Sequence, residues 1–460
     1  MVQIVCILMG FIFVCLALVL GFLLYNRYKT IDLMIIFIFS LIIFNGFIPV
    51  FLINEESNRF FIDYLYIIKT YTVIDILMYY IQNITLLLSS IFGWMIIKKN
   101  YRLVLDENKE RANGSSSLKK IRNIAKFCLI LSIGSYYLYS QPYGGFINLL
   151  EYTSSLRSGI ITVNNPFSFL QKFGRFSIFS TLLFCGLILD KKYKKTDLLY
   201  GLISIIFSIY YLYSLGGRVS FISFFLILLL ARIFYKYQQK INLKLVTRMI
   251  FVLIGIILGL YYMTKFFIRG TVDLAIIDFF INEISFAFAS FRNVINYPGI
   301  FLFKHVILSP LYFLPSSIWN LKFGFDTATS FNTFLFTGGY KGEGDISGSV
   351  PLDIISFSWL EGGFFGPVII GILYGLLLAV LQRKLNEISN KGVRSFIFSY
   401  MIVEFAILVV PYGDTVHLIQ SAFSFIIGFC ILTHMLKNKV KSKRSQLSIP
   451  DSVNGIEEGE

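Results

Sequence analysis

Long runs of apolar residues, separated by short polar stretches, follow one another along most of the chain. A helix of about 20 apolar residues is long enough to cross the hydrocarbon core of a bilayer. The pattern therefore predicts eleven transmembrane helices. They are expected at roughly 2–24, 32–53, 73–97, 124–140, 175–190, 198–215, 219–235, 249–267, 363–382, 395–412 and 417–436.

The predicted fold class is all-α: a polytopic membrane protein with a single membrane domain over residues 1–436. Apolar residues make up 56% of the chain, more than in a soluble domain. A polar tail, 437–460, follows the last apolar run. Two long segments, 141–174 and 268–362, are expected to be loops. The first apolar run has no basic residues in front of it, so we expect a retained helix rather than a cleaved signal peptide.

Basic residues gather in alternate turns between the predicted helices. Most of the 41 lysines and arginines fall on one side of the membrane if the helices alternate strictly. Because basic loops stay in the cytoplasm, we expect the N-terminus outside and the C-terminus inside. Both long loops then lie outside. The net charge of +15 is explained by the inner loops and does not indicate a nucleic-acid partner.

Part of the second long loop, residues 297–319, is apolar but is broken by Pro298, Pro310 and Pro315. Proline in a helix interior removes a backbone hydrogen bond and costs about 3 kcal/mol. A further span here would also reverse the three helices that follow and spoil the charge pattern. We therefore expect a re-entrant or interfacial segment that packs on the bundle.

No residue pattern indicates a metal or a cofactor. The five cysteines lie in apolar runs, without the spacing of zinc ligands or of a disulfide framework. Motifs of phosphate-binding loops, dinucleotide folds, zinc proteases and α/β-hydrolases are missing from the sequence. ATP hydrolysis, dinucleotide chemistry, zinc-dependent proteolysis and α/β-hydrolase chemistry therefore lose support.

The candidate site begins with Arg218, which follows Gly216 and Gly217 and opens the seventh predicted helix. Glycines let the backbone approach a ligand closely, and a guanidinium offers a planar fork of donors suited to phosphate. Arg269 and Arg292 lie in the large outer loop and are candidates for the same anion-binding role. The alternative for each arginine is an anchor that reaches the lipid headgroups.

Four residues of the large outer loop are candidates for a general base. They are Asp345, Asp353, Glu361 and His305. Asp345 lies in a glycine-rich run, where a solvated turn is the alternative interpretation. Asp353 and Glu361 flank Trp359, a combination typical of sugar sites and also of the aromatic belts of membrane proteins. The alternative for His305 is a structural role.

Glu404 lies near the middle of the tenth predicted helix. A carboxylate at that depth is rare and costly, so a functional role is the default hypothesis. The alternative is a structural pair with an arginine or a tyrosine of a neighbouring helix.

Three motifs together resemble those of bacterial O-antigen and capsule repeat-unit polymerases of the Wzy type. They are Gly216-Gly217-Arg218 before a mid-chain helix, Ser347-Gly348-Ser349-Val350-Pro351 at the end of the large outer loop, and Leu360-Glu361-Gly362-Gly363-Phe364-Phe365-Gly366 entering a span. The topology is similar over most of the chain, whereas the motifs cover only Arg218 and residues 347–366.

The resemblance implies a metal-independent glycosyltransferase of the GT-C-like group, on the outer face of the bacterial inner membrane. Its substrate would be an oligosaccharide repeat unit carried on undecaprenyl diphosphate, and the growing chain would move onto a new lipid-linked unit. Arg218 matches the family's functional arginines by motif, Arg269 and Arg292 by position only. Expected partners are membrane lipids, a chain-length regulator and a flippase, but no nucleic acid.

Three other functions stay open. The first is a lipid-linked oligosaccharide flippase or another transporter, which would explain Glu404 but would place its site midway in the bilayer between repeats, and no repeat is visible. The second is the related O-antigen ligase, which uses the same donor. The third is a non-enzymatic assembly or sensor protein.

Reporter fusions test the predicted orientation. Because basic turns stay inside, fusions after Lys120, Lys195 and Lys441 are expected to report the cytoplasm, and fusions near Asn164 and Lys341 the outside. A cytoplasmic signal at Lys341 would contradict the orientation and would turn the candidate site inward.

Overall fold

The computed structural model describes most of the chain. The described residues are 1–55, 63–99, 115–159, 163–237, 247–248, 255, 258–259, 276–315, 326–344, 346 and 348–446. Within these ranges every regular element is a helix, as the apolar pattern predicts.

The α-helices are α1 (Val2–Tyr28), α2 (Leu33–Leu41), α3 (Ile48–Asn54), α4 (Asp63–Lys69), α5 (Val73–Lys99), α6 (Ser115–Ser140), α7 (Phe146–Leu149), α8 (Thr153–Ser158), α9 (Phe176–Leu189), α10 (Lys195–Ser214), α11 (Arg218–Tyr237), α13 (Ile276–Ile295), α14 (Lys304–Ile307), α16 (Ala328–Thr337), α17 (Ile354–Gly362), α18 (Gly366–Asn386), α19 (Lys391–Met401), α20 (Thr415–Ser421) and α21 (Phe423–Gln446). The 3₁₀ helices are η2 (Gln141–Tyr143), η3 (Leu150–Tyr152), η4 (Ser168–Arg175), η5 (Ser309–Phe313) and η6 (Gly363–Phe365). The π-helices are η1 (Ile42–Phe47) and η7 (Ile402–Ile407).

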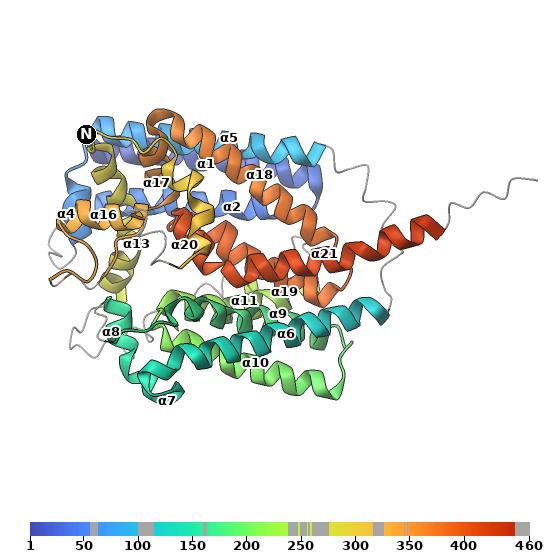
Figure 1. Ribbon diagram of the computed structural model, residues 1–460. Coiled ribbons are helices and arrows are strands. Elements are labelled where there is room, and N and C mark those ends of the chain that lie inside the picture. The colour runs from blue at the N-terminus through green and yellow to red at the C-terminus, as the bar shows by residue number, and fades with distance from the viewer. Residues whose placement is uncertain are drawn as a thin grey trace, which may run out of the picture.

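The long helices form two groups that run side by side (Figure 1). In one group α5 packs against α1 and α18, and in the other α9 packs against α6 and α10. Helix α19 contacts α9, α11 and α18 and so joins the groups. The short helices α4, α7, α8 and α16, together with the longer α13, gather at one end of the bundle, at the left of Figure 1. The two predicted outer loops therefore meet at the same end.

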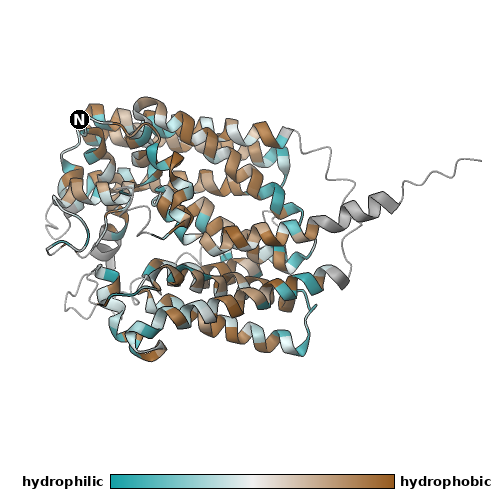
Figure 2. Ribbon diagram, in the orientation of Figure 1, coloured by the Kyte–Doolittle hydropathy of each residue, from teal (hydrophilic) through white to brown (hydrophobic). Residues whose placement is uncertain are grey.

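Seven helical segments of the described residues are long and apolar enough to cross a membrane. They are Val2–Tyr28, Leu33–Asn54, Val73–Lys98, Ser168–Leu189, Lys195–Ser214, Arg218–Tyr237 and Ile354–Asn386. The pair α20 and α21, which is bent by 62°, gives up to eight. Apolar residues cover the long helices (Figure 2), and large ones such as Phe11 and Phe22 are exposed, as expected of side chains that face lipid. The chain is a polytopic membrane protein.

The predicted spans agree with the helices except at four of them. Residues 249–267 lie almost entirely outside the described part of the chain. Helix α6 falls on the predicted span 124–140, and α19 with η7 falls on the predicted span 395–412. Neither is among the segments that are long and apolar enough to cross a membrane. For α6 one physical reason is its basic first half, with Lys119, Lys120 and Arg122. The span predicted at 363–382 is longer, because α17 begins at Ile354.

The large outer loop contains more regular structure than its composition predicts. Helix α13 has 20 residues, and α16 has 10. Both were expected to be loop, because each carries polar residues within a short apolar pattern. The described part of the segment broken by prolines, residues 297–315, forms only α14 and η5. This short, irregular structure agrees with a segment that does not cross the bundle.

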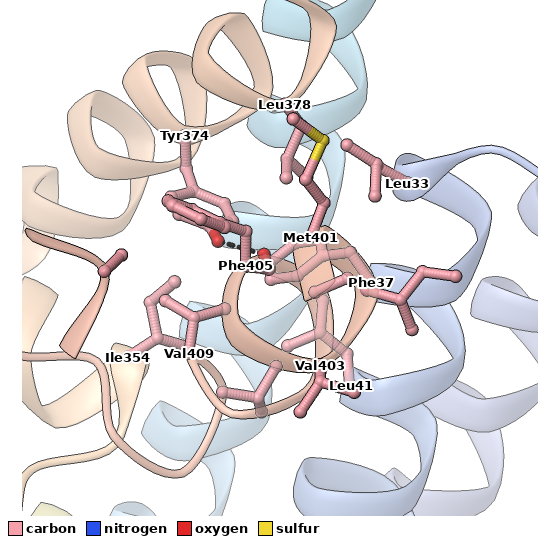
Figure 3. Close-up of a cluster of buried hydrophobic side chains, with 14 of the residues drawn as sticks. Leu33, Phe37, Leu41, Ile354, Tyr374, Leu378, Met401, Val403, Phe405 and Val409 are labelled. Carbon is pink, nitrogen blue, oxygen red and sulfur yellow. Dashed lines mark hydrogen bonds between the residues drawn. The ribbon is translucent and has the colours of Figure 1, made fainter. Parts of the chain in front are cut away.

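The π-helix η7 lies in the core of the bundle, against α2 and α18 (Figure 3). The Leu408 amide donates to the Val403 carbonyl, which is the i to i−5 bond of a π-helix. The Tyr374 hydroxyl of α18 donates to the Phe405 carbonyl and satisfies a group that the wider turn leaves without its helical partner. Apolar residues of α2 and α18 surround this turn in Figure 3. The turn is therefore held rigidly, together with Glu404 inside it.

Glycines bring α5 and α18 into close contact. A Cβ added to Gly375 would lie 2.0 Å from the Ser90 carbonyl oxygen, and one on Gly93 would lie 2.3 Å from the Ile372 carbonyl oxygen. Small residues at such positions are typical of helix pairs in membranes, where close van der Waals packing stabilises the pair.

Gly375→Ala is therefore expected to destabilise the protein by about 1–3 kcal/mol, the usual cost of overpacking a core. Gly134→Ala is the matched control, because a Cβ there meets no atom within 4 Å. The thermal midpoint of each purified variant in detergent measures the effect. Equal midpoints for the two variants would contradict the packing of α5 on α18.

Candidate functional site

A cavity of about 360 Å³ opens at the end of the bundle where the predicted outer loops meet. It lies between elements that are far apart in the sequence: α4, α8, the start of α11, α13, η7 and α20. Its lining residues are Tyr64, Arg157, Gly217, Arg218, Val219, Ser220, Glu283, Phe286, Ser349, Pro351, Glu404, Leu408, Tyr412, His417 and Ser421. This mixture of aromatic, apolar and charged groups in one hollow is typical of ligand sites.

The turn between α10 and α11 places Arg218 at the cavity. Gly216 has a φ of 61°, which a residue with a Cβ rarely adopts. A Cβ on Gly216 would also lie 3.1 Å from Cγ2 of Thr153 and 3.3 Å from Cδ of Arg157. Gly216 therefore allows the turn to rest on α8. This contact brings Arg157 of α8 next to Arg218.

Arg218 pairs with Glu283 of α13. Its Nη2 atom lies 2.9 Å from Oε1 of Glu283, and the two side chains are 14% and 24% exposed. At this partial burial the pair is screened less than an ion pair on an open surface. The pair fixes the guanidinium at the wall of the cavity and links α11 to α13.

Three basic side chains gather around this wall. The pKa of Arg157 is lowered by burial and by the charge of Arg218, while Glu283 raises it. Burial and the charge of Arg157 lower the pKa of Lys341. Lys341 reaches α8 because Gly159 and Gly342 allow close contact between the two loops. Mutual repulsion of this kind shows an excess of positive charge, with Glu283 as the carboxylate that offsets part of it.

Aromatic side chains form another part of the cavity wall. The rings of Phe286 and Tyr412 have centroids 5.3 Å apart, and Tyr412 stacks on His417 at 5.0 Å. Nε2 of His417 is buried and has no hydrogen-bond partner. Tyr64 completes this wall from α4. Flat aromatic surfaces beside unsatisfied polar atoms suit a ligand with both apolar faces and hydroxyl groups.

The cavity continues toward the middle of the bundle. A narrow extension of about 20 Å³ shares Ser220, Glu404 and Ser421 with it and also borders Arg175 and Tyr400. Nη1 of Arg175 donates to the Ser421 carbonyl, and the Tyr400 hydroxyl donates to the same carbonyl over 3.3 Å. Ser421 lies at the 62° break between α20 and α21. Broken helices inside a membrane protein are typical of places that line a polar cavity.

Arg175 was not recognised in the sequence, although it lies half-buried beside the cavity. It follows Gly174, whose missing side chain is required because a Cβ would lie 2.3 Å from the ring of Tyr211. The guanidinium is close enough to Glu404 for their charges to interact. The available signal was a lone arginine at the start of one predicted span and a lone glutamate within another, since buried charges in membranes usually pair.

Arg292 lies away from the cavity lining. Its Nη1 atom is 3.2 Å from Oδ2 of Asp75 and 2.8 Å from Oδ1 of Asn296. Asp75 in turn accepts hydrogen bonds from the amide and hydroxyl of Thr72 at the start of α5. Arg292 thus joins α13 to the start of α5, and the structure does not bring it together with Arg218.

His305 and Glu361 form a buried pair with each other. Nδ1 of His305 is hydrogen-bonded to Oε1 of Glu361, and the His305 amide donates to Oε2 over 3.1 Å. The two residues are 2% and 0% exposed. Neither is among the residues that line the cavity. Their hydrogen bonds attach the segment around α14 to helix α17.

Asp353 is the N-cap of α17. Its carboxylate accepts hydrogen bonds from the amides of Ile355 and Ser356 and from the Ser356 hydroxyl. It is 1% exposed and does not line the cavity. Burial raises its pKa to about 7 from 3.8, although these hydrogen bonds lower it.

Two predicted site residues, Arg269 and Asp345, lie outside the described residues. Of the arginines and candidate bases predicted for the site and described by the structure, Arg218 lines the cavity, and so does Glu404, for which the sequence predicted a functional role by its depth. No group of three or more histidines, cysteines or carboxylates suited to a metal ion occurs in the described ranges.

The raised pKa of Asp353 predicts a pH dependence of stability. The group stabilises the fold below its unfolded pKa of about 3.8, and the contribution is lost as pH rises to about 7. Asp353→Asn keeps an N-cap but cannot ionise. Its thermal midpoint in detergent is therefore expected to fall less between pH 5 and pH 8 than that of the native chain. Parallel curves for the two proteins would contradict the raised pKa.

The chain matches no protein-family model, and comparisons with curated proteins and with solved structures also give no match. The likeness to the Wzy-type polymerases therefore rests on the motifs of the sequence alone.

Proposed function

We propose that the protein polymerises oligosaccharide repeat units carried on undecaprenyl diphosphate into O-antigen or capsular polysaccharide. The observation that supports this most is the cavity at the end of the bundle, which Arg157 and Arg218 line together with aromatic residues. The proposal includes the bacterial inner membrane, eleven spans of the GT-C-like group, and a site on the outer face with the C-terminus inside.

The positive wall suits the diphosphate of the donor. Arg218 and Arg157 offer guanidinium donors in the forked geometry that phosphate oxygens accept. Glu283 holds Arg218 in place and lowers the excess of positive charge. A diphosphate would take over part of this pairing when it binds. Arg269 stays a proposed contributor from the same outer loop.

The aromatic wall suits the sugars. A cavity of about 360 Å³ has room for part of an oligosaccharide rather than a whole polymer. The C–H faces of sugar rings are apolar and pack on rings such as Tyr64 and Tyr412. The unpartnered Nε2 of His417 offers a hydrogen-bonding atom to a hydroxyl group. This division of the wall matches a substrate that has both a charged and a sugar part.

The reaction moves the growing chain from its carrier to the new unit. A hydroxyl oxygen of the acceptor sugar forms a bond to the anomeric carbon of the donor, and the bond from that carbon to the diphosphate oxygen breaks. The electron pair leaves with undecaprenyl diphosphate, and the hydroxyl proton passes to a base. Fixed positive charge at the leaving group lowers the barrier by several kcal/mol, about 3–4 for a single preorganised donor.

A transporter of lipid-linked oligosaccharide is the second candidate function. The half-buried charges Arg175 and Glu404 beside a broken helix favour it, because transporters often bind cargo at interrupted helices in mid-membrane. The gel pattern of a deletion strain separates the functions. Single-unit surface chains indicate loss of a polymerase, whereas units that accumulate on the cytoplasmic face indicate loss of a flippase. Lipid-linked polymer without surface chains indicates loss of a ligase.

Substitutions of Arg218 test the diphosphate role. Arg218→Ala is expected to lower polymer formation at least about 100-fold, and Arg218→Lys about 10-fold, because lysine keeps the charge but loses the fork of donors. Polymer from a complemented deletion strain is measured on gels and normalised to the amount of protein in the membrane.

Arg292→Ala is the matched control, since it removes an arginine of the same loop that does not line the cavity. It is expected to leave polymer per molecule unchanged. Full-length polymer from the Arg218→Ala strain would rule out the diphosphate role of Arg218. Equal losses in both variants would show that general damage to the loop, rather than the cavity, causes the effect.

A further inference from the structure

The proposed reaction requires a group that accepts the proton of the acceptor hydroxyl. Among the described residues that line the cavity, the carboxylates are Glu283 and Glu404. Glu283 is bound to Arg218 and belongs to the wall suited to the diphosphate. The candidates from the sequence, Asp353, Glu361 and His305, have partners elsewhere in the fold.

Glu404 lies where the cavity meets its narrow extension. It lines both spaces, together with Ser220 and Ser421. Ser220 follows Arg218 by two residues on α11, so the wall with Arg218 and the position of Glu404 belong to one continuous hollow. A donor whose diphosphate lies at Arg218 and an acceptor hydroxyl at Glu404 would therefore share the same space.

The backbone around Glu404 is specialised. The carboxylate is carried by the π-helix η7, and single π-turns inside α-helices are frequent at functional sites. The Tyr374 hydroxyl and the packing of α2 and α18 hold this turn (Figure 3). A structural ion pair alone would not require the wider turn, since an α-helix also presents a carboxylate to a neighbour.

Arg175 keeps Glu404 suited to proton transfer. Its guanidinium is fixed by the Ser421 carbonyl and by Tyr211, and its charge acts on the Glu404 carboxylate. This fixed positive charge offsets part of the cost of placing the Glu404 carboxylate among apolar helices. Arg175 therefore positions the carboxylate beside the cavity.

We infer that Glu404 is the general base of the glycosyl transfer and that Arg175 is its positioning residue. This inference rests on the proposed function. The Glu404 carboxylate takes the proton from the acceptor hydroxyl while the new bond to the anomeric carbon forms and the bond to the diphosphate breaks. The resulting carboxylic acid then releases the proton to the departing diphosphate or to water, and the site returns to its initial state.

The test uses purified full-length protein in lipid nanodiscs, with lipid-linked repeat units isolated from the deletion strain. Glu404→Gln is expected to lower kcat about 100-fold or more, the usual contribution of a general base. Its affinity for undecaprenyl diphosphate, added as a probe, is expected to stay within about two-fold, because the phosphate contacts lie at the other wall. Glu387→Gln, at the far end of α18, is the control and is expected to turn over normally.

A double variant covers the case in which Glu404→Gln fails to fold. Glu404→Gln alone leaves the Arg175 charge buried without its partner, which is strongly destabilising. The double variant Glu404→Gln with Arg175→Gln removes both charges, and it is expected to fold and to show the same loss of kcat. Glu404→Asp, which keeps a carboxylate, is expected to recover part of the rate in both kcat and polymer length.

Each outcome decides the inference. Turnover of Glu404→Gln or of the folded double variant within about three-fold of the native protein overturns the role of Glu404. Loss of probe binding together with turnover also overturns it, because a base does not hold the diphosphate. If the native protein itself turns over no lipid-linked unit, the proposed function fails first. If the native protein turns over the lipid-linked units and Glu404→Gln does so at the same rate, only the role of Glu404 as general base is contradicted.

Discussion

A charge buried among apolar helices is costly unless another charge or a set of donors compensates it. Around the cavity this constraint joins parts of the chain that are distant in sequence. Arg218 of α11 pairs with Glu283 of α13, and the charge of Arg175, just before α9, is offset by Glu404 in η7. The Arg218–Glu283 ion pair holds α11 and α13 together at the cavity wall.

The two ends of the cavity differ in chemistry. Near α8 the charges of Arg157, Arg218 and Lys341 act on one another, so an anion is favoured there. Toward the bundle centre the cavity is lined by Glu404 of the π-helix η7 and by Ser421 at the break between α20 and α21. A donor with a diphosphate and an acceptor with a hydroxyl need these two environments side by side. A transported molecule would need no such separation of a leaving-group site from a basic one.

Hydropathy predicted the fold well, because each span is a local property of about 20 residues. It missed the amphipathic helix α13, which lies in a loop that was expected to be irregular. Arg218 was found from the sequence because its signal, two preceding glycines, is also local. Gly216 indeed adopts a positive φ in the turn that presents it.

The remaining site residues depend on contacts that a sequence does not display. His305, Glu361 and Asp353 are residue types that often act in catalysis. In the structure His305 and Glu361 bind each other, and Asp353 caps helix α17. Arg175 lies at the start of a predicted span, and only the fold brings it beside its neighbours from α10, α19 and η7. Which charges meet is decided by packing between elements, and packing is not encoded in any single window of residues.

The central claim is that this chain alone joins lipid-linked repeat units. The most direct measurement is reconstitution of the purified protein in nanodiscs with such units and no other protein, followed by separation of the products by chain length. The account predicts a ladder of longer lipid-linked chains, with one undecaprenyl diphosphate released for each bond formed and without added metal or nucleotide. Unchanged single units and no released undecaprenyl diphosphate, from protein that is folded and in the membrane, would contradict it.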